Sequence, residues 1–348
     1  MPTFFADQLQ QIASRILQGA GVPPEHAGVV AENLADANLV GHDSHGVIRL
    51  AQYVEHIQQG FNDATGSPQV VLRQPSLTLI DGHNQLGQVV ATQALQLALE
   101  QARVHGTFTV LCRNCWHVGR LGFYTERAAR QGFVAMMAVN SPAIGRTAPW
   151  GGLEPRLSTN PISIAIPWRD HPIVLDMTSS ATAEGKIRVA YQKGESIPEG
   201  WLIDADGNPV TDPAALYQDE KVLMLPLGGT MGHKGYGLGV VIDLLCGILS
   251  GYGFARQDIP LGANGVWLHL MDRKALMTDD DCDEQIKRYV AWIKSSRKAP
   301  GFDEIFMPGE IEQRQRALRS RDGVLVPDET WQRLEQLAAN LKVSLKGI

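Results

Sequence analysis

The sequence has few cysteines and no long apolar run. Four cysteines in 348 residues are too few for a disulfide framework, so we expect reduced thiols and a cytoplasmic location. The nearest approach to an apolar run, Val240 to Leu249, contains Asp243 and is shorter than the roughly 18 residues that a membrane-spanning helix needs. The first residues, 1–20, also lack the basic and apolar blocks of a signal peptide. We therefore expect no membrane partner.

Basic runs are missing as well. The 31 Lys and Arg residues are scattered among 37 Asp and Glu residues, and the formal net charge is −6. Because nucleic-acid-binding proteins concentrate basic residues in a patch or stripe, we expect no nucleic-acid partner. No GxGxxG fingerprint occurs, and the spacing before Lys234 does not match a Walker A loop. Neither a Rossmann nor a P-loop nucleotide site is predicted.

Glycine, in contrast, is abundant, with 35 residues against a usual share of roughly 7%. The rest of the composition, with 44% hydrophobic and 20% charged residues, is typical of globular proteins. A cluster of glycines lies between Gly228 and Gly239, and Gly119 and Gly122 lie on either side of Arg120. The excess therefore indicates many tight turns or places where the backbone approaches another group closely.

The spacing of apolar residues changes along the chain and predicts two domains. Residues 1–70 and 285–348 are predicted to form a helical domain, and residues 71–284 an α/β domain. The expected strands are Val70 to Leu72, Leu77 to Ile80, Thr107 to Leu111, Val134 to Val139, Ile162 to Ile166, Ile173 to Leu175 and Val266 to Leu270. The expected helices include Ala91 to His105 and a buried helix from Gly235 to Leu249. Helices at both ends predict that the two ends pack together.

The first motif is His42-Asp43-Ser44-His45-Gly46, followed by Arg49 and Tyr53. If Asp43 or Ser44 caps a helix, then His45, Arg49 and Tyr53 share one face of it. A guanidinium can hold a carboxylate, and an imidazole or a phenol can exchange a proton, so this face suits a small carboxylic acid. The alternative is that these residues only cap the helix and cover its surface. The spacing matches no usual zinc site, so no metal is predicted.

The second motif runs from Cys112 to Gly122 and contains a CxxC pair. A zinc site would need a second pair of ligands, and a thioredoxin-like site would place the pair at the start of a helix, so both are disfavoured. His117 and the following Gly119-Arg120-Leu121-Gly122 form a junction between a strand and a helix. Such a junction can bind an anion, or it can be an ordinary turn.

Two further segments could bind a nucleotide. Leu175-Asp176-Met177-Thr178-Ser179 places a carboxylate and hydroxyls just after a strand. The glycine-rich segment from Gly228 to Gly239 contains His233 and Lys234 and precedes an apolar helix. It can form an anion cradle, or its glycines can serve only to pack the helix.

Together, these motifs resemble the type-2 malate/L-lactate dehydrogenase family. The resemblance is carried by the residues quoted above and by Thr159-Asn160-Pro161, His233-Lys234-Gly235-Tyr236-Gly237 and Pro308-Gly309-Glu310, in the order of the family. The stretch Arg188 to Gly194, through Gly200, is most similar to its hydroxycarboxylate dehydrogenase B branch. The resemblance implies a non-Rossmann, mixed-sheet cofactor domain beside a helical domain, and a homodimer with its active site in the cleft between the domains.

The resemblance also implies roles for individual residues. His117 and His45 are the catalytic residues, with His117 the favoured proton carrier and His45 at the nicotinamide. Arg49 holds the substrate carboxylate, and Tyr53 lines the substrate pocket. The implied contacts of NAD or NADP, of which NAD is favoured, are His45, Gly119, Arg120, Leu121, Leu175, Asp176, Met177, Thr178, Ser179, His233, Lys234, Asn264, Pro308, Gly309 and Glu310.

The expected function is a hydride transfer between NAD(P)H and a small 2-oxo acid, which gives a 2-hydroxy acid. A proton must reach the substrate oxygen in this reaction, so its carrier has to lie within hydrogen-bond reach of that oxygen. Two alternatives stay open: a reductase of cyclic 2-imino acids on the same fold, and a nucleotide-binding protein without catalysis. The side chain of the substrate is not predicted.

Overall fold

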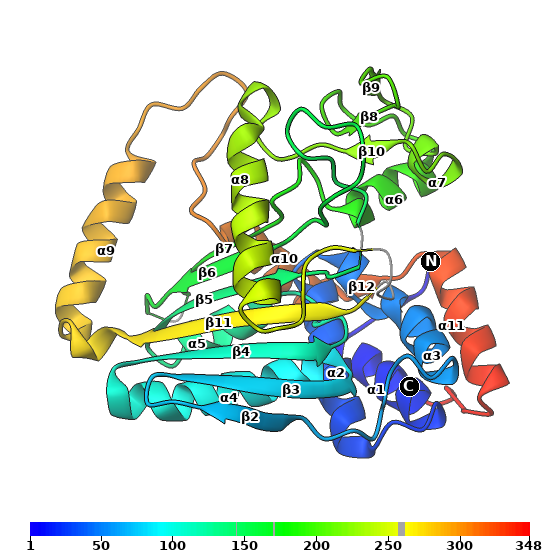
Figure 1. The fold of residues 1–348 in the computed structure, drawn as a ribbon, viewed down its shortest axis with the longest axis horizontal. Helices are drawn as coiled ribbons and strands as arrows, with labels where there is room; N and C mark the ends of the chain where they lie inside the picture. Colours follow the sequence, from blue (N-terminus) through cyan, green and yellow to red (C-terminus); the bar gives the residue numbers. More distant parts are fainter. Residues whose placement is uncertain (144, 170, 257–261) are drawn as a thin grey trace.

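A seven-stranded mixed sheet forms the centre of the molecule (Figure 1). The computed structural model describes residues 1–143, 145–169, 171–256 and 262–348. The strand order is β2-β3-β4-β11-β5-β6-β7, and among these neighbours the β3–β4 pair is parallel while the others are antiparallel. The strands are β2 (Gln69–Arg73), β3 (Leu77–Gln85), β4 (Thr107–Cys115), β5 (Phe133–Asn140), β6 (Ile162–Ile166), β7 (Ile173–Met177) and β11 (Asn264–Asp272). The predicted mixed α/β fold is confirmed, and each of the expected strands overlaps one of these seven.

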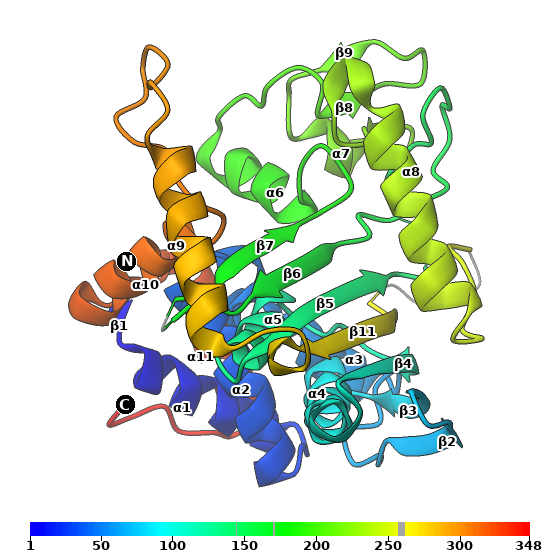
Figure 2. The same cartoon turned by 90° about the vertical axis from the view of Figure 1, so that its left-hand side faces the viewer.

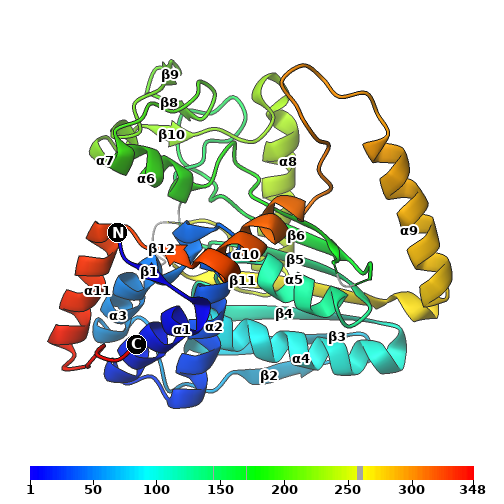
Figure 3. The same cartoon turned by 180° about the vertical axis from the view of Figure 1, so that it is seen from behind.

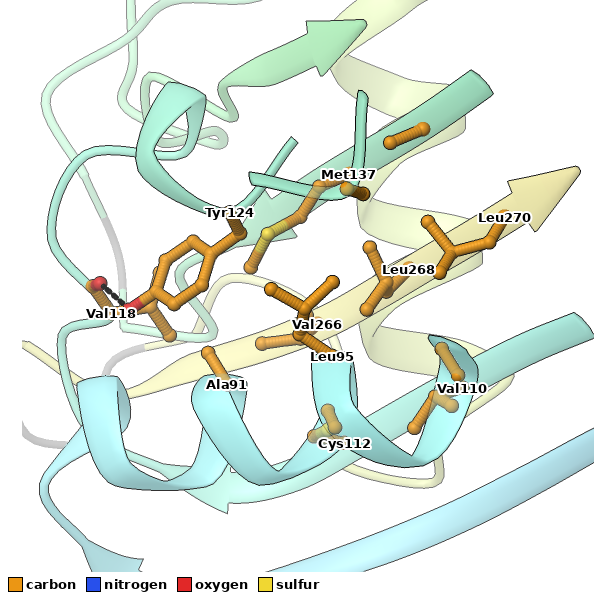
Figure 4. Close-up of a cluster of buried hydrophobic side chains, with 14 of the residues drawn as sticks. Ala91, Leu95, Val110, Cys112, Val118, Tyr124, Met137, Val266, Leu268 and Leu270 are labelled. Carbon is orange, nitrogen blue, oxygen red and sulfur yellow. Dashed lines mark hydrogen bonds between the residues drawn. The ribbon is translucent and has the colours of Figure 1, made fainter. Parts of the chain in front are cut away.

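Successive side chains of β11 point alternately into two different cores, one on each face of the sheet. Val266, Leu268 and Leu270 are buried in the main core, against α4 (Gly87–His105) and α5 (Gly122–Ala129). Trp267, between them, packs on the opposite face against α8 (His233–Ile242) and the π-helix η4 (Asp243–Ile248). Successive side chains of a strand point to opposite faces of the sheet, so β11 is covered by helices on both faces. Figure 4 shows the main core, where the Tyr124 hydroxyl donates a hydrogen bond to the Val118 carbonyl at 2.6 Å.

Both ends of the chain pack in a second core. It joins α1 (Ala6–Gly19), α2 (Pro24–Leu39) and α3 (Leu50–Gln58) to α11 (Asp328–Asn340). The first strand pairs with the last one, β1 (Thr3–Phe4) with β12 (Val324–Leu325), so Thr3 lies opposite Leu325. Figure 3 shows this helical unit, with both termini, beside the sheet.

Helix α9 (Asp279–Lys294) stands away from that helical unit, at the opposite end of the sheet in Figure 1, and is nearest the viewer in Figure 2. The expected domain boundary at residue 285 falls inside α9, so the chain returns to the helical unit only with α10 (Glu310–Asp322) and β12. The division into domains at residues 70 and 285 stays a prediction. In the part of the chain that the structure describes, no helix is long and apolar enough to cross a membrane.

A small unit lies above the sheet, at the top of Figure 1. It has its own core around Ile187, Leu202, Leu216 and Met224. Its elements are α6 (Glu184–Lys193), β8 (Leu202–Ile203), β9 (Pro209–Val210), α7 (Ala215–Gln218) and β10 (Leu223–Met224). The short 3₁₀ turns of the chain are η1 (Asp43–His45), η2 (Val47–Arg49), η3 (Gly229–Met231) and η5 (Arg273–Ala275).

The expectation of a buried helix from Gly235 to Leu249 was wrong. The segment forms α8 and then the π-helix η4, and only one side of it packs on the sheet. Val241 and Leu244 are each 49% exposed and Leu249 is 67% exposed. An almost continuous apolar sequence cannot distinguish a buried helix from one that presents an apolar face to a surface.

Candidate active site

A cleft of about 540 Å³ lies where the helical unit, the sheet and the small unit meet. Its walls come from η1, the start of α5, the end of β7, the start of α6 and α10. The residues that line it are Gly41, His42, Asp43, Ser44, His45, Gly119, Arg120, Leu121, Pro161, Asp176, Met177, Thr178, Ser180, Ala181, Thr182, Ala183, Gly185, Lys186, Val189, Leu227 and Glu312. The cleft therefore brings together three of the predicted segments, those around His45, Arg120 and Asp176.

The segment from His42 to Arg49 is not the capped helix that the spacing predicts. It forms the two 3₁₀ turns η1 and η2, and α3 begins only at Leu50. Asp43 does not cap a helix, because its carboxylate accepts hydrogen bonds from Asn38 and Arg319. The Ser44 hydroxyl lies 3.0 Å from Nδ1 of His45. The chain thus presents His45 to the cleft on an irregular turn rather than on a helix face.

His117 follows β4 and lies beside His45. Their imidazole rings are 5.5 Å apart and inclined by 30°. Nδ1 of His117 lies 2.7 Å from the Tyr53 hydroxyl, which in turn accepts a hydrogen bond from Nε2 of Gln88 at 2.8 Å. Tyr53 therefore contacts His117 directly, although the two residues are far apart in sequence.

Both imidazoles are held in the neutral form. Burial, together with the positive charge of Arg49 and the neighbouring His56, lowers the pKa of His117 to about 3. Burial also lowers the pKa of His45 well below its usual value, helped by His117 and Arg49. Burial raises the pKa of Tyr53 to about 12, so this phenol is protonated at neutral pH. Tyr53, His45 and His117 are therefore all uncharged at neutral pH, and the Tyr53 phenol and the neutral imidazoles each keep a proton that a hydrogen bond can share.

Arg49 has a positive charge that the protein does not neutralise. Its Nε donates to the Ser44 carbonyl at 2.7 Å, and Nη1 donates to Oε1 of Gln52 at 2.9 Å. Within residues 1–143, 145–169, 171–256 and 262–348, no carboxylate forms an ion pair with it. A guanidinium that is held in place by neutral partners can still bind a carboxylate ligand.

The start of α5 lines the cleft, but its charges are satisfied within the protein. Arg120, whose side chain is 2% exposed, lies 3.1 Å from Asp36, 3.8 Å from Glu126 and 3.4 Å from Asp176. Asp176 also accepts a hydrogen bond from the Gly122 backbone N–H at 2.8 Å. The anion at this helix N-terminus is thus a carboxylate of the protein itself, so Arg120 and Gly122 are not free to bind a second one.

The segment after β7 contributes unequally to the cleft. Asp176, Met177 and Thr178 line it, whereas Ser179 is buried and donates from its hydroxyl to the Thr159 carbonyl at 3.0 Å. Leu175 is exposed and does not line the cleft.

The glycines at the start of α8 pack against protein atoms. A Cβ at Gly232 would collide with the ring of Trp150, and a Cβ at Gly235 would collide with the backbone of Leu227. Close packing, the alternative interpretation of this segment, accounts for these glycines. His233 and Lys234 are exposed, and neither lines the cleft, although Leu227 does.

The remaining expected cofactor contacts also lie outside the lining of the cleft. Asn264 is buried, accepts from the Val118 N–H at 3.1 Å and so supports the turn that follows His117. The Pro308 carbonyl accepts from the Val174 N–H at 3.1 Å, Gly309 takes a φ of 92°, and Glu310 forms an ion pair of 2.6 Å with Lys294.

The CxxC pair belongs to the core. Cys112 and Cys115 are buried, and burial raises the pKa of both thiols, which makes them unreactive. Cys115 donates a hydrogen bond from Sγ to the Asn264 carbonyl at 2.9 Å. No group of three His, Cys, Asp or Glu side chains that could hold a metal ion occurs among the residues that the structure describes.

Sequence reasoning missed Gln88 and Glu312. Glu312 lines the cleft from α10, and Gln88 reaches the site from the start of α4. Neither belongs to a motif, so only their position in the fold reveals them. Lys186, to which the Leu175–Ser179 segment leads in the sequence, lines the cleft from α6.

The family of this chain follows from sequence comparison. A family model described as malate/L-lactate dehydrogenase matches residues 4–335. The chain belongs to this family. It is 37% identical to an L-lactate dehydrogenase from Cupriavidus necator, with 97% of both chains covered. It is 34% identical to hydroxycarboxylate dehydrogenase B from Escherichia coli K12, covering 94% of this chain and 91% of the relative.

Solved structures agree with this family. Malate dehydrogenase from Pyrococcus horikoshii superposes with a TM-score of 0.90 at 32% identity, covering 99% of this chain and 96% of the other. A delta1-piperideine-2-carboxylate reductase from Pseudomonas syringae superposes with a TM-score of 0.84 at 28% identity, covering 97% of this chain and 100% of the other. The resemblance read from the motifs is confirmed, and the protein is an oxidoreductase of the malate/L-lactate dehydrogenase family that acts on 2-hydroxy acids.

Proposed function

We propose that this protein transfers a hydride between NAD(P)H and a small 2-oxo acid, and that His117 carries the proton. The observation that supports this most directly is the pair of neutral, stacked imidazoles of His45 and His117 beside the unpaired charge of Arg49. A 2-oxo acid has a carboxylate for Arg49 and a carbonyl oxygen that needs a proton donor. The site offers one group for each.

The residues of the cleft fit a dinucleotide. A volume of about 540 Å³ lies within the range of cofactor and ligand sites, roughly 300–1,000 Å³. Lys186 lines the cleft, is exposed and has no ion-pair partner in the described part of the chain, so its ammonium can meet a phosphate. When bound there, the nicotinamide supplies or accepts the hydride. His45 would lie at the nicotinamide, and Arg49 would hold the substrate in line with it.

Some of the other expected cofactor contacts line the cleft, and the rest are supported by the family resemblance alone. We propose that Gly119, Leu121, Met177 and Thr178 contact the cofactor along the cleft, and that Arg120 and Asp176 hold its wall together. Leu175, Ser179, His233, Lys234, Asn264, Pro308, Gly309 and Glu310 are proposed contacts on the strength of the family resemblance. A cofactor domain built in this way is of a non-Rossmann type. NAD is preferred over NADP in the proposal.

We also propose a homodimer. Val241 on α8, Leu244 and Ile248 on η4, and Leu249 directly after it are exposed apolar side chains that a second copy could cover. Light scattering should give twice the chain mass, and Leu244→Glu should give a single chain mass. A single mass for the unmodified protein would contradict the dimer.

A reducing cytoplasmic location is proposed as well, because all four cysteines are free thiols and three of them are buried. This proposal is independent of the catalytic one.

The activity is tested by the oxidation of NADH and of NADPH with pyruvate, phenylpyruvate, oxaloacetate and 2-oxoglutarate. We expect turnover with at least one acid, a loss of at least roughly 100-fold in kcat for His117→Gln, and a raised KM for Arg49→Lys. His105→Gln, at the exposed end of α4, is the matched control and should not change the rate. Absence of turnover together with absence of cofactor binding in calorimetry would sink the proposal.

A second candidate is a reductase of cyclic 2-imino acids, which the similarity to the piperideine-carboxylate reductase favours. Such a substrate also carries a carboxylate for Arg49 and needs a proton donor. The same assay with cyclic 2-imino acids separates the two candidates. Cofactor binding without turnover on either panel would instead indicate a nucleotide-binding protein without catalysis.

A further inference from the structure

Gln88 is a buried polar residue at the active site that the mechanism above does not use. It lies in the first turn of α4 and has no exposed surface. Its Nε2 donates to the Tyr53 hydroxyl at 2.8 Å, and the Tyr53 oxygen lies 2.7 Å from Nδ1 of His117. The three side chains come from α4, α3 and the end of β4, so they form a chain of hydrogen bonds across three elements.

The direction of these hydrogen bonds determines where the proton of His117 lies. An amide nitrogen can only donate, so the Tyr53 oxygen accepts from Gln88, and the single phenolic proton is left for Nδ1 of His117. A neutral imidazole that accepts at Nδ1 carries its proton on Nε2. Nε2 has no partner in the part of the chain that the structure describes, so it is the nitrogen left for a substrate oxygen.

The other orientation of the Gln88 amide would reverse the whole chain. With Oε1 toward Tyr53, the phenol would donate to Gln88, Nδ1 of His117 would donate to the phenol, and Nε2 would present a lone pair. Oε1 is buried and has no partner among the described residues. The orientation of this one amide and the tautomer of His117 are therefore coupled.

The backbone holds Gln88 in place next to His117. A Cβ at the preceding residue, Gly87, would collide with the Trp116 carbonyl oxygen and lie 2.6 Å from the His117 carbonyl carbon. Helix α4 thus begins directly against the backbone that carries His117, which only glycine permits. The two residues cannot move apart without displacing the start of the helix.

We propose that Gln88 is a positioning residue that acts through Tyr53 to keep the proton of His117 on Nε2, facing the substrate oxygen. This inference rests on the proposed function, in which His117 is the proton carrier. It also assigns Tyr53 a role different from the one read from the sequence: the phenol orients His117 instead of lining the substrate pocket. In this form His117 offers a hydrogen-bond donor to the oxygen of a 2-oxo group.

The tautomer can be measured without turnover. In the unmodified protein with ¹⁵N-labelled histidine, we expect the His117 signals to show a protonated Nε2 and a bare Nδ1, with His117→Gln giving the assignment. Gln88→Glu replaces the donor by a carboxylate that accepts from Tyr53, so the proton of His117 should move to Nδ1. Thr92→Val, one turn further along α4, removes a buried hydroxyl that has no partner and should leave the tautomer unchanged.

Kinetics give a second readout that a purely structural role would not produce. Gln88→Leu should lower kcat about 10-fold, the order expected for one lost hydrogen bond, with little change in KM. Gln88→Glu should be slower still at high pH and recover as the pH falls, because a protonated carboxyl can again donate to Tyr53. Thr92→Val should keep the full rate.

Two results would overturn the inference: a proton on Nδ1 of His117 in the unmodified protein, or a tautomer that is the same in Gln88→Glu. If Gln88→Glu does not fold, Tyr53→Phe serves instead, since it removes the link and should release the tautomer preference. If the protein shows the expected tautomers but turns over no substrate, the proposed function fails, and only the control of the His117 tautomer by Gln88 stands.

Discussion

Two helices of this protein begin with glycine-rich segments that contain a basic residue, and the structure uses them in opposite ways. At the start of α5, Arg120 is buried among three carboxylates and lines the cleft. At the start of α8, Lys234 is exposed and has no ion-pair partner in the described ranges. From the sequence alone, both segments indicate an anion site.

The difference shows that a basic residue near a helix start has two distinct uses. A buried, paired guanidinium joins elements: Asp36 lies on α2, Glu126 on α5 and Asp176 on β7. The three carboxylates balance the positive charge of this guanidinium, so it adds little attraction for a further anion. An exposed ammonium without a partner contributes little to folding and keeps its charge for a ligand.

The largest expected effect is that of removing the buried cation. Arg120→Met would leave the Asp176 carboxylate without a cation, while Arg316 still pairs with Asp36 and Glu126, and should lower the free energy of unfolding by about 3 kcal/mol, the low end for a broken buried ion pair. Lys234→Met, the matched change on α8, should alter it by less than about 0.5 kcal/mol. Urea unfolding of both variants measures this. A loss below about 1 kcal/mol for Arg120→Met would show that the network contributes no more than a surface ion pair.

The second effect compares two glycines on α8. Gly235→Ala places a methyl group on the Leu227 backbone and should destabilise the protein by about 1–3 kcal/mol. Gly237 has nothing within 4 Å of its Cβ position, so Gly237→Ala should stabilise it by about 0.5–1 kcal/mol through better helix propensity. Thermal unfolding distinguishes them. Equal effects would mean that packing does not explain the glycines of this segment.

The third effect concerns cofactor binding at the exposed cation. Lys234→Ala should weaken NAD(P)H binding about 5- to 10-fold, the order of one charge-assisted hydrogen bond, while stability stays unchanged. Because the ammonium is exposed, this difference should shrink as salt is added. Calorimetric titration at two salt concentrations tests it. Unchanged binding would remove Lys234 from the proposed cofactor contacts.

The smallest effect is the pH dependence of stability caused by His117, which lies shortly before α5 in the sequence. The pKa of His117 is lowered to about 3 in the folded protein, so between pH 6.5 and 3 the unfolded chain binds a proton that the folded one does not. Stability should therefore fall as the pH drops through 6.5, by roughly 1 kcal/mol at pH 6. His117→Gln should weaken this dependence and leave the share of His45, whose pKa burial also lowers, while His233→Gln at the start of α8 should leave the dependence unchanged. Urea midpoints between pH 5 and 8 check both; equal slopes in all three proteins would contradict the assignment to His117.

Much of the fold could be predicted because its signals are local. The periodic apolar residues predicted the strands of the sheet and the helices at both ends of the chain, and the helix predicted to end at His105 does end there. Which face of a helix is packed and which is exposed was harder to predict from the sequence. The segment from Gly235 to Leu249 is apolar on all sides, so nothing in it shows that Val241 and Leu244 remain exposed.

The candidate site could be predicted only where its residues belong to ordered motifs. His45, Arg49 and His117 were proposed in this way, and the structure places them close together. The hydrogen bond from Gln88 to Tyr53 and the ion pair of Arg120 with Asp36 join residues that are far apart in sequence. Such partners are chosen by tertiary packing, which a single sequence does not display. The irregular turns at His45 were missed because the motif also satisfies helical spacing.

The pairing of the first strand with one near the end of the chain has a consequence for synthesis. Thr3 lies opposite Leu325, and the core of the helical unit draws on α1 and α11 together. The sheet from β2 to β11 can form while the chain is still on the ribosome, because all of its strands are made before residue 273. The helical unit must wait until α11 has left the ribosome. During that interval α1 and α2 expose an apolar face, and the cleft lacks a wall until α10, which contains Glu312, has been made.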